Sequence, residues 1–94
     1  MIVTGWRGGT YGVRIGKRNV RTYFDRSWNE IEVEIDGKAY KLPLRNTFWT
    51  TCPEFRGSVI GVWFKQNKLI PWKPGKPPKL NLTKTEGNRF ILSL

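Results

Sequence analysis

The groups in this chain that are suited to ligand chemistry are arginines and lysines close to aromatic, glycine and asparagine residues. Arg and Lys neutralise phosphates, glycine lets the backbone approach them, and Asn or Arg can read base edges through paired hydrogen bonds. These types occur together in four segments: Trp6-Arg7-Gly8-Gly9, Arg14 to Arg21, Arg45-Asn46-Thr47-Phe48-Trp49, and Arg56-Gly57. The pattern predicts a nucleic-acid-binding surface, with candidate contacts from Arg7, Arg14, Lys17, Arg18, Arg21, Arg45, Asn46, Trp49 and Arg56.

The charge balance points to the same class of partner. The chain of 94 residues has 17 Lys and Arg against 7 Asp and Glu, which gives a net charge of +10. Residues 1–21 contain five basic residues and no acid, whereas residues 22–37 contain five of the acids. Such a chain repels itself on folding, so a polyanionic partner is expected, and nucleic acid is the commonest one. We expect duplex DNA rather than RNA.

Residues that could catalyse a reaction or hold a metal ion are scarce. The chain has no histidine, the side chain that titrates near neutral pH when unperturbed. Cys52 has no His partner that could activate a thiolate, so we expect it to be a small apolar filler. No Cys/His set suits zinc. We therefore expect a protein without enzymatic activity, catalytic residues, a metal ion or a small-molecule cofactor.

Length and hydropathy limit the domain organisation and the compartment. The longest apolar run, residues 59–64, is interrupted by Gly61 and is far shorter than the roughly 20 residues of a membrane helix. Residues 1–5 do not resemble a signal peptide, and the single cysteine cannot form an intrachain disulfide. We expect one domain over residues 1–94, a cytoplasmic location and no membrane partner. The oligomeric state is left open.

The clearest structural pattern lies between residues 30 and 44. Acids at positions 30, 32, 34 and 36 alternate with Ile31, Val33 and Ile35, which is the period of a half-buried strand. Asp36-Gly37 favours a two-residue type I′ turn. The resulting register places Val33 opposite Tyr40, Ile31 opposite Leu42 and Glu32 opposite Lys41. The acids therefore share an exposed face, expected to point away from the ligand, and Pro43 lies at a sheet edge or a strand exit.

A second hairpin is expected at the end of the chain. Leu80 and Leu82 alternate with polar residues, and Phe90 and Leu92 do the same after Glu86-Gly87-Asn88. An odd-length loop is needed to place Leu82 opposite Leu92. The preceding Pro-rich residues 71–78 are expected to form a stiff connection with Trp72 anchored in the core.

Two short helices and two further strands complete the expected fold. Residues 17–24 and 58–67 are predicted to be helical, the second with Ser58 as its N-cap. Residues 11–15 are predicted to be a strand, and residues 1–10 a short strand followed by a flexible loop. The fold class is therefore mainly β (α+β), a small curved sheet or pseudobarrel with one or two short helices.

The order of these elements resembles the plant B-three DNA-binding domain, and is similar to the effector domains of some restriction endonucleases that share its seven-stranded pseudobarrel. The resemblance spans residues 11–94 and rests on element order and on aromatic residues such as Trp49, Trp63 and Phe90. It implies two arms that grip the DNA major groove: one with Arg14, Lys17 and Arg18, the other with Arg45, Asn46, Thr47 and Trp49. The Pro-rich stretch stands where that family has a Gly-Asp turn.

Each candidate contact also has a plainer structural interpretation. Lys17, Arg18 and Arg21 can form a solvated helix face, and the Arg-Gly-Gly segment can be a flexible loop. Trp28, Trp63 and Phe64 are expected in the core, and Trp49 fits either role. The lysines at 73, 76, 79 and 84 are expected to provide solubility and a general field. The alternative functions are an RNA or single-strand binding barrel and a protein-interaction or inhibitor module.

Overall fold

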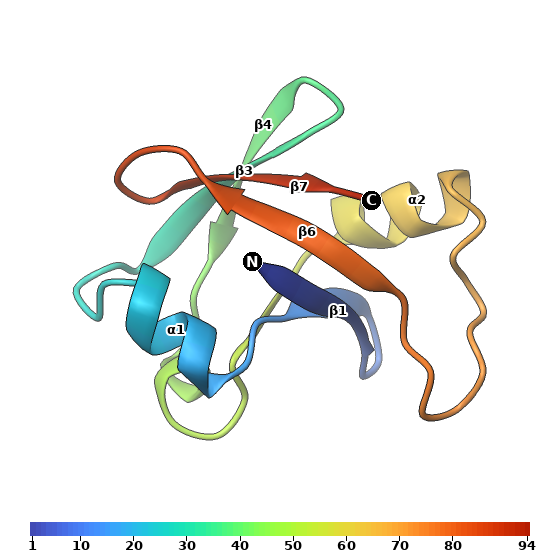
Figure 1. The fold of residues 1–94 in the computed structure, drawn as a ribbon, viewed down its shortest axis with the longest axis horizontal. Coiled ribbons are helices and arrows are strands. Elements are labelled where there is room, and N and C mark those ends of the chain that lie inside the picture. The colour runs from blue at the N-terminus through green and yellow to red at the C-terminus, as the bar shows by residue number, and fades with distance from the viewer.

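A computed structural model describes all residues, 1–94, and contains seven strands, two α-helices and one 3₁₀ helix (Figure 1). In chain order these are β1 (Ile2–Arg7), β2 (Tyr11–Arg14), α1 (Lys17–Tyr23), β3 (Glu30–Ile35), β4 (Lys38–Pro43), η1 (Asn46–Trp49), β5 (Glu54–Arg56), α2 (Ser58–Gln66), β6 (Lys79–Lys84) and β7 (Arg89–Ser93). No helix is both long enough and apolar enough to cross a membrane.

All seven strands belong to one sheet in the order β4-β3-β7-β6-β1-β2-β5. Neighbouring strands are antiparallel, except for the parallel pair β3 and β7. The sheet curls until its two outer strands approach each other: a Cβ atom on Gly57, just after β5, would lie 2.9 Å from Leu42 Cδ2 on β4. The predicted mainly β pseudobarrel is therefore confirmed, as a nearly closed seven-stranded sheet.

The interior contains 19 buried hydrophobic residues, and the two helices lie at opposite ends of the molecule (Figure 1). At the α1 end, the Phe24 ring stacks on Phe90 with centroids 4.8 Å apart, and Phe48 packs against Phe24 at 5.2 Å. At the α2 end, Tyr11 packs edge-on against both Phe64 and Trp72. Because aromatic side chains bury large areas, these two clusters close the ends of the barrel.

Both hairpins have the predicted register. Val33 pairs with Tyr40, Ile31 with Leu42 and Glu32 with Lys41. The turn residues Asp36 and Gly37 have φ of 51° and 83°, as a type I′ turn requires. In the second hairpin Leu82 pairs with Leu92, and the Thr85 N–H donates to the Arg89 carbonyl, which leaves a three-residue loop at 86–88. Pro43 lies on β4, an outer strand, as predicted.

The predicted helices and the Pro-rich anchor are also present. The Trp72 ring is partly buried against the core. The helix α2 begins at Ser58, but its N-cap is Gly57 and no side chain caps it, so the prediction of Ser58 as the cap was wrong. The reason is that Gly57 leaves β5 in an extended conformation and turns directly into the helix.

Strand β5 was not predicted. Its three residues pair antiparallel with β2, Phe55 opposite Val13 and Arg56 opposite Gly12. Cys52, just before it, is exposed, so its predicted role as an apolar filler was wrong. The buried positions of this segment are instead occupied by Phe48, Pro53 and Phe55, which are larger and fill the interior better.

Candidate nucleic-acid interface

Helix α1 is held on the barrel by its apolar side. Val20 is buried on the helix, and Phe24, the residue that ends it, is buried next to Phe90. Lys17, Arg18 and Arg21 fall on the other side and are exposed. A helix of two turns is marginal alone, so its docking on the barrel fixes where these three cations stand.

Two polar side chains also attach α1 to the sheet. The Asn19 side-chain amide donates to the carbonyls of Ile15 and Ile2. The Lys84 ammonium on β6 donates to the Tyr23 carbonyl at 3.1 Å, which satisfies an acceptor left open at the helix C-terminus. Lys84 was expected to provide solubility and a general field, and the structure shows that it also makes this contact.

Helix α1 carries cations without an acidic partner on the same helix. Lys17 and Arg21 are four residues apart, so their side chains are neighbours on the helix surface. Like charges at this spacing destabilise a helix by about 0.2–0.5 kcal/mol. Only two basic residues of the molecule, Arg56 and Arg89, form ion pairs. The cations of α1 are therefore free to bind an external anion.

The segment from Arg45 to Pro53 crosses the molecule beside α1 (Figure 1). Its turn is tight, because the Thr47 carbonyl accepts hydrogen bonds from the N–H groups of the three residues 50–52 at 2.8–3.2 Å. Phe48 is only 1% exposed and anchors the turn in the core. The Trp49 ring is braced at 86° against Phe48, with centroids 4.9 Å apart, and stays half-buried at the surface.

Helix α1, the turn before β3 and η1 together enclose a surface cleft of about 350 Å³, which we call the α1–η1 cleft. Its lining consists of Lys17, Val20, Arg21, Arg26, Phe48, Trp49, Thr50 and Pro53. The lining thus contains three cations, an indole ring and a hydroxyl group, and no carboxylate. This site can hold an anion beside a flat ring.

The cleft brings together three of the nine predicted contact residues: Lys17, Arg21 and Trp49. Arg18 is exposed on α1, and Arg45 and Asn46 are exposed at the start of η1. None of these three lines the cleft. Arg26, which lines it, was not predicted as a contact.

Arg14 and Arg56 lie on the outer face of β2 and β5, away from the cleft lining. The Arg56 guanidinium lies 4.6 Å from the centroid of the Trp6 ring and 3.6 Å from a Glu54 carboxylate oxygen. Gly12 stands between Trp6 and Arg56 in the paired strands, and its missing side chain lets the two meet. The internal partners of Arg56 make it a poor candidate for phosphate binding, whereas Arg14 is exposed and without an ion pair.

Arg7 lies in another depression, of about 260 Å³, at the turn between β1 and β2. Its lining is Arg7, Gly8, Gly9, Thr10 and Tyr11. The turn is closed by a hydrogen bond from the Gly8 N–H to the Thr10 carbonyl at 2.9 Å. The Arg-Gly-Gly segment therefore lines a depression that is separate from the α1–η1 cleft and contains a single cation, Arg7.

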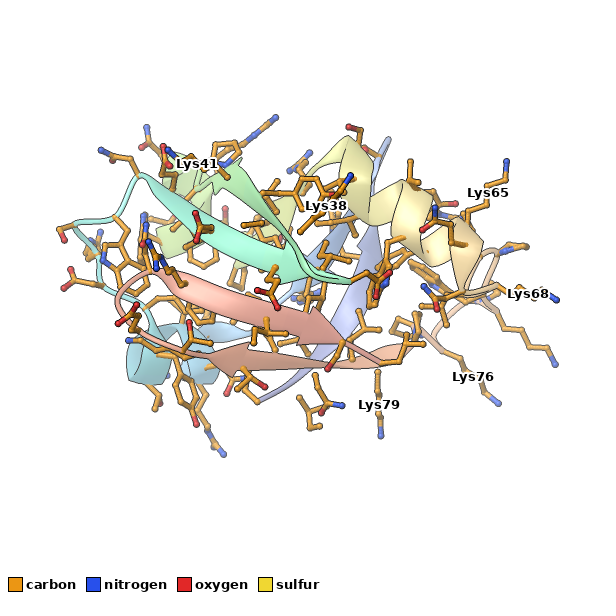
Figure 2. All side chains as sticks on the ribbon, turned by 90° about the horizontal axis from the view of Figure 1, so that it is seen from above. Lys38, Lys41, Lys65, Lys68, Lys76 and Lys79 are labelled. Atoms are coloured by element: carbon orange, nitrogen blue, oxygen red, sulfur yellow. The ribbon has the colours of Figure 1, made fainter.

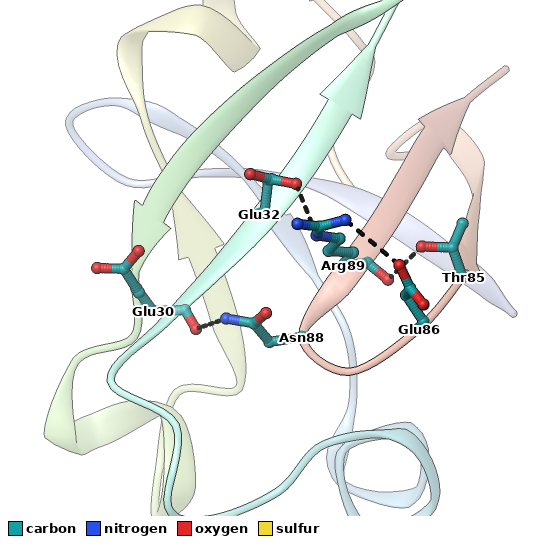
Figure 3. Close-up of polar contacts among 6 residues, drawn as sticks. All are labelled: Glu30, Glu32, Thr85, Glu86, Asn88 and Arg89. Atoms are coloured by element: carbon teal, nitrogen blue, oxygen red, sulfur yellow. Dashed lines mark hydrogen bonds and ion pairs between the residues drawn. The ribbon is translucent and has the colours of Figure 1, made fainter.

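One acidic residue of β3, Glu32, is paired with Arg89, as Figure 3 shows. The Arg89 side chain lies between the carboxylates of Glu32, at 3.2 Å, and Glu86, at 3.3 Å. The neighbouring Asn88 amide donates to the Glu30 carbonyl at 3.1 Å. Glu32 was predicted opposite Lys41, which the register confirms, but its ion pair is with Arg89 on the parallel strand β7.

A second group of basic residues lies at the α2 end of the molecule. Lys65, Lys68 and Lys76 project there from α2, the residues after it and the Pro-rich connection (Figure 2). All three are exposed and none has an ion pair. These three lysines line none of the four depressions of the surface, which makes them a natural control for the effect of charge alone.

The turn that carries Arg26 is ordered by its neighbours. The Asp25 carboxylate accepts hydrogen bonds from the Ser27 backbone N–H at 2.9 Å and the Ser27 hydroxyl at 2.7 Å. The backbone hydrogen bond, followed by the side-chain one, lowers the pKa of Asp25 below its ordinary value. The turn thereby fixes the backbone of Arg26 at the edge of the cleft.

No protein-family model, curated protein or solved structure matches this chain. Arg26 could have been noticed from the sequence, because Asp25-Arg26-Ser27 is a turn sequence that follows directly on the basic helix. That the turn meets η1 depends on long-range packing, for which no local signal exists.

Proposed function

We propose that this protein binds duplex DNA through the face formed by α1 and the Arg45–Pro53 crossover, without catalysing a reaction. The observation that carries the proposal is the meeting of Lys17, Arg21, Arg26 and Trp49 around one cleft that no carboxylate lines. A folded protein gains nothing in stability from unpaired like charges, so their gathering favours an anionic ligand.

Phosphates are bound by two arms on either side of the cleft. Lys17, Arg18 and Arg21 form one arm and Arg45 the other, and Arg14 extends the field along β2. Asn46 and Trp49 are the candidates for base or sugar contact. The resemblance to the plant B-three domain assigns DNA contacts to the same two segments, which supports the choice of duplex DNA.

The acidic face of β3 sets the orientation of the complex. Glu30, Glu32 and Glu34 lie along one strand and are repelled by a phosphate backbone. The bound duplex therefore lies away from β3. Arg89 offsets part of this charge through its pairs with Glu32 and Glu86.

The test is a binding titration at several salt concentrations with a labelled duplex, a single strand and an RNA hairpin. If about five phosphates are contacted, the slope of log K against log salt is roughly −4 to −5 on duplex DNA. The duplex is expected to bind most tightly. Tighter binding of the RNA hairpin or the single strand would replace duplex DNA by that ligand, and no binding to any of them at low salt would overturn the proposal.

A further inference from the structure

We infer that the α1–η1 cleft receives one unpaired nucleotide, either extruded from the bound duplex or at a strand end. Its phosphate lies among Lys17, Arg21 and Arg26, and its base lies against Trp49. The inference rests on the proposed function and states which part of the nucleic acid enters the cleft.

The shape of the cleft selects a small occupant. Its volume of about 350 Å³ lies at the lower end of the roughly 300–1,000 Å³ found for small-molecule sites. A duplex can lie across such a hollow but cannot enter it, because its bases are stacked inside the helix. A single nucleotide that has left the stack has the size class that fits.

The charges of the cleft suit a phosphate group. Arg21 and Arg26 present planar guanidinium groups, which bind phosphate oxygens in pairs, and Lys17 adds a compact positive charge. These three come from α1 and from the Asp25–Ser27 turn, so they approach the cleft from two segments. No carboxylate in the lining competes for them.

The indole of Trp49 suits a nucleobase. Phe48 is 1% exposed and holds the Trp49 ring at 86° from its own plane, so little conformational freedom is lost when a base packs against it. Stacking of one base on an aromatic side chain changes affinity by roughly 5- to 150-fold. The Thr50 hydroxyl, also in the lining, adds a donor and an acceptor for base or sugar.

The other depressions on the surface lack this combination. The one at Arg7 has a single cation, and its aromatic residue, Tyr11, packs on Phe64 and Trp72. The one beside β3 is lined by Glu32, Glu34 and Glu86. A fourth, between β4 and α2, is lined by Lys38 and Trp63 among others, but Trp63 is only 3% exposed and Asp36 adds a carboxylate. Among the four depressions, several cations together with a half-exposed indole and no carboxylate occur only in the α1–η1 cleft.

The first test uses the whole protein and small probes. Nuclear magnetic resonance spectra are recorded with 2′-deoxyadenosine 5′-monophosphate, deoxyribose 5-phosphate and inorganic phosphate. The nucleotide is expected to shift the Trp49 indole N–H signal, assigned by its loss in Trp49→Phe, and inorganic phosphate is expected to leave it unchanged. A nucleotide that leaves the Trp49 signal unchanged would overturn the inference.

The second test compares two duplexes of equal length, one fully paired and one with a single unpaired adenosine. The wild-type protein is expected to bind the second roughly 10-fold more tightly, the range that one stacked base provides. In Trp49→Leu the two duplexes should bind with equal affinity, because the ring on which the unpaired base stacks is gone. Lys17→Gln, an exposed change that leaves the core intact, should weaken binding of the unpaired nucleotide in parallel.

The outcomes separate this inference from the proposed function. Equal affinity for the two duplexes, with the salt dependence retained, overturns the nucleotide site and leaves duplex binding in place. A preference that survives in Trp49→Leu also overturns it, because the unpaired base is then held elsewhere. Absence of binding to both duplexes overturns both proposals.

Discussion

Removing the three cations of the α1–η1 cleft should weaken DNA binding far more than removing three cations from the other end of the molecule. The cleft variant combines Lys17→Gln, Arg21→Gln and Arg26→Gln. The control variant combines Lys65→Gln, Lys68→Gln and Lys76→Gln, which lie at the α2 end (Figure 2). Both variants lose the same three charges, so any difference between them reports position and not net charge.

The magnitude follows from counterion release. Each phosphate contact contributes about 0.9 to the slope of log K against log salt, so the loss of three contacts makes the slope less steep by about 2.7. If the cleft variant and the wild type bind equally at 1 M salt, this change of slope makes the variant bind roughly 500-fold more weakly than the wild type at 0.1 M salt. The control variant should change the slope by much less than 1, because its lysines belong to no cleft and act only through the general field.

The assay is fluorescence anisotropy of a labelled duplex at four or more salt concentrations, with thermal unfolding of each variant as the folding control. Gln has nearly the helix propensity of Lys and Arg, and the change removes the repulsion between positions 17 and 21. The cleft variant should therefore be as stable as the wild type or slightly more so. Equal changes of slope in the two variants would refute the reasoning, since binding would then follow total charge and need no defined site.

Three further predictions concern the fold and the crossover. Gly12→Ala should lower the free energy of unfolding by about 1–3 kcal/mol in urea denaturation, because a Cβ atom would lie 2.5 Å from the Phe55 carbonyl oxygen; wild-type stability would contradict the β2–β5 pairing. The Asp25 carboxyl should titrate below its usual pKa in carbon-13 spectra because Ser27 donates two hydrogen bonds to the ionised form. Ser27→Ala should raise that pKa part of the way back to its ordinary value, because the hydroxyl donor is lost while the backbone N–H of residue 27 still donates. The stabilisation from this turn is present above the pKa of Asp25 in the unfolded chain and is lost as the pH falls through the lower pKa of the folded protein. An unchanged pKa in the variant would contradict the hydrogen bond from the Ser27 hydroxyl. Cys52 is exposed and should react with a thiol reagent in the native protein about as fast as in urea, whereas protection until unfolding would show that it is buried.

The parts of the fold that the sequence predicted are those that depend on neighbours along the chain. The β3–β4 hairpin follows from a period of two and from the φ preference of Asp36-Gly37, and both act within a few residues. Helix α1 follows from the spacing of Val20 and Phe24. In each case the local pattern is consistent with one structure only. For the hairpin this is why the predicted strand register is also correct.

The parts that the sequence did not predict depend on distant segments. Strand β5 is short, and its partner β2 lies about 40 residues earlier in the chain. Arg56 has the residue type of a phosphate ligand, but its guanidinium lies over Trp6, fifty positions away. The cleft likewise forms only when the turn at Arg26 meets Trp49. Residue type indicated the candidate phosphate ligands, and packing decided which of them have no internal partner.

The most direct test of the central claim is to map the bound surface by titrating the isotope-labelled protein with a short duplex and following its backbone amide signals. Signals of residues 17–26 and 45–52 should move most, and those of β3, Glu30–Ile35, should stay in place. Changes centred on α2 and the Pro-rich connection, or no change at all at low salt, would contradict the proposal that the face formed by α1 and the crossover binds DNA.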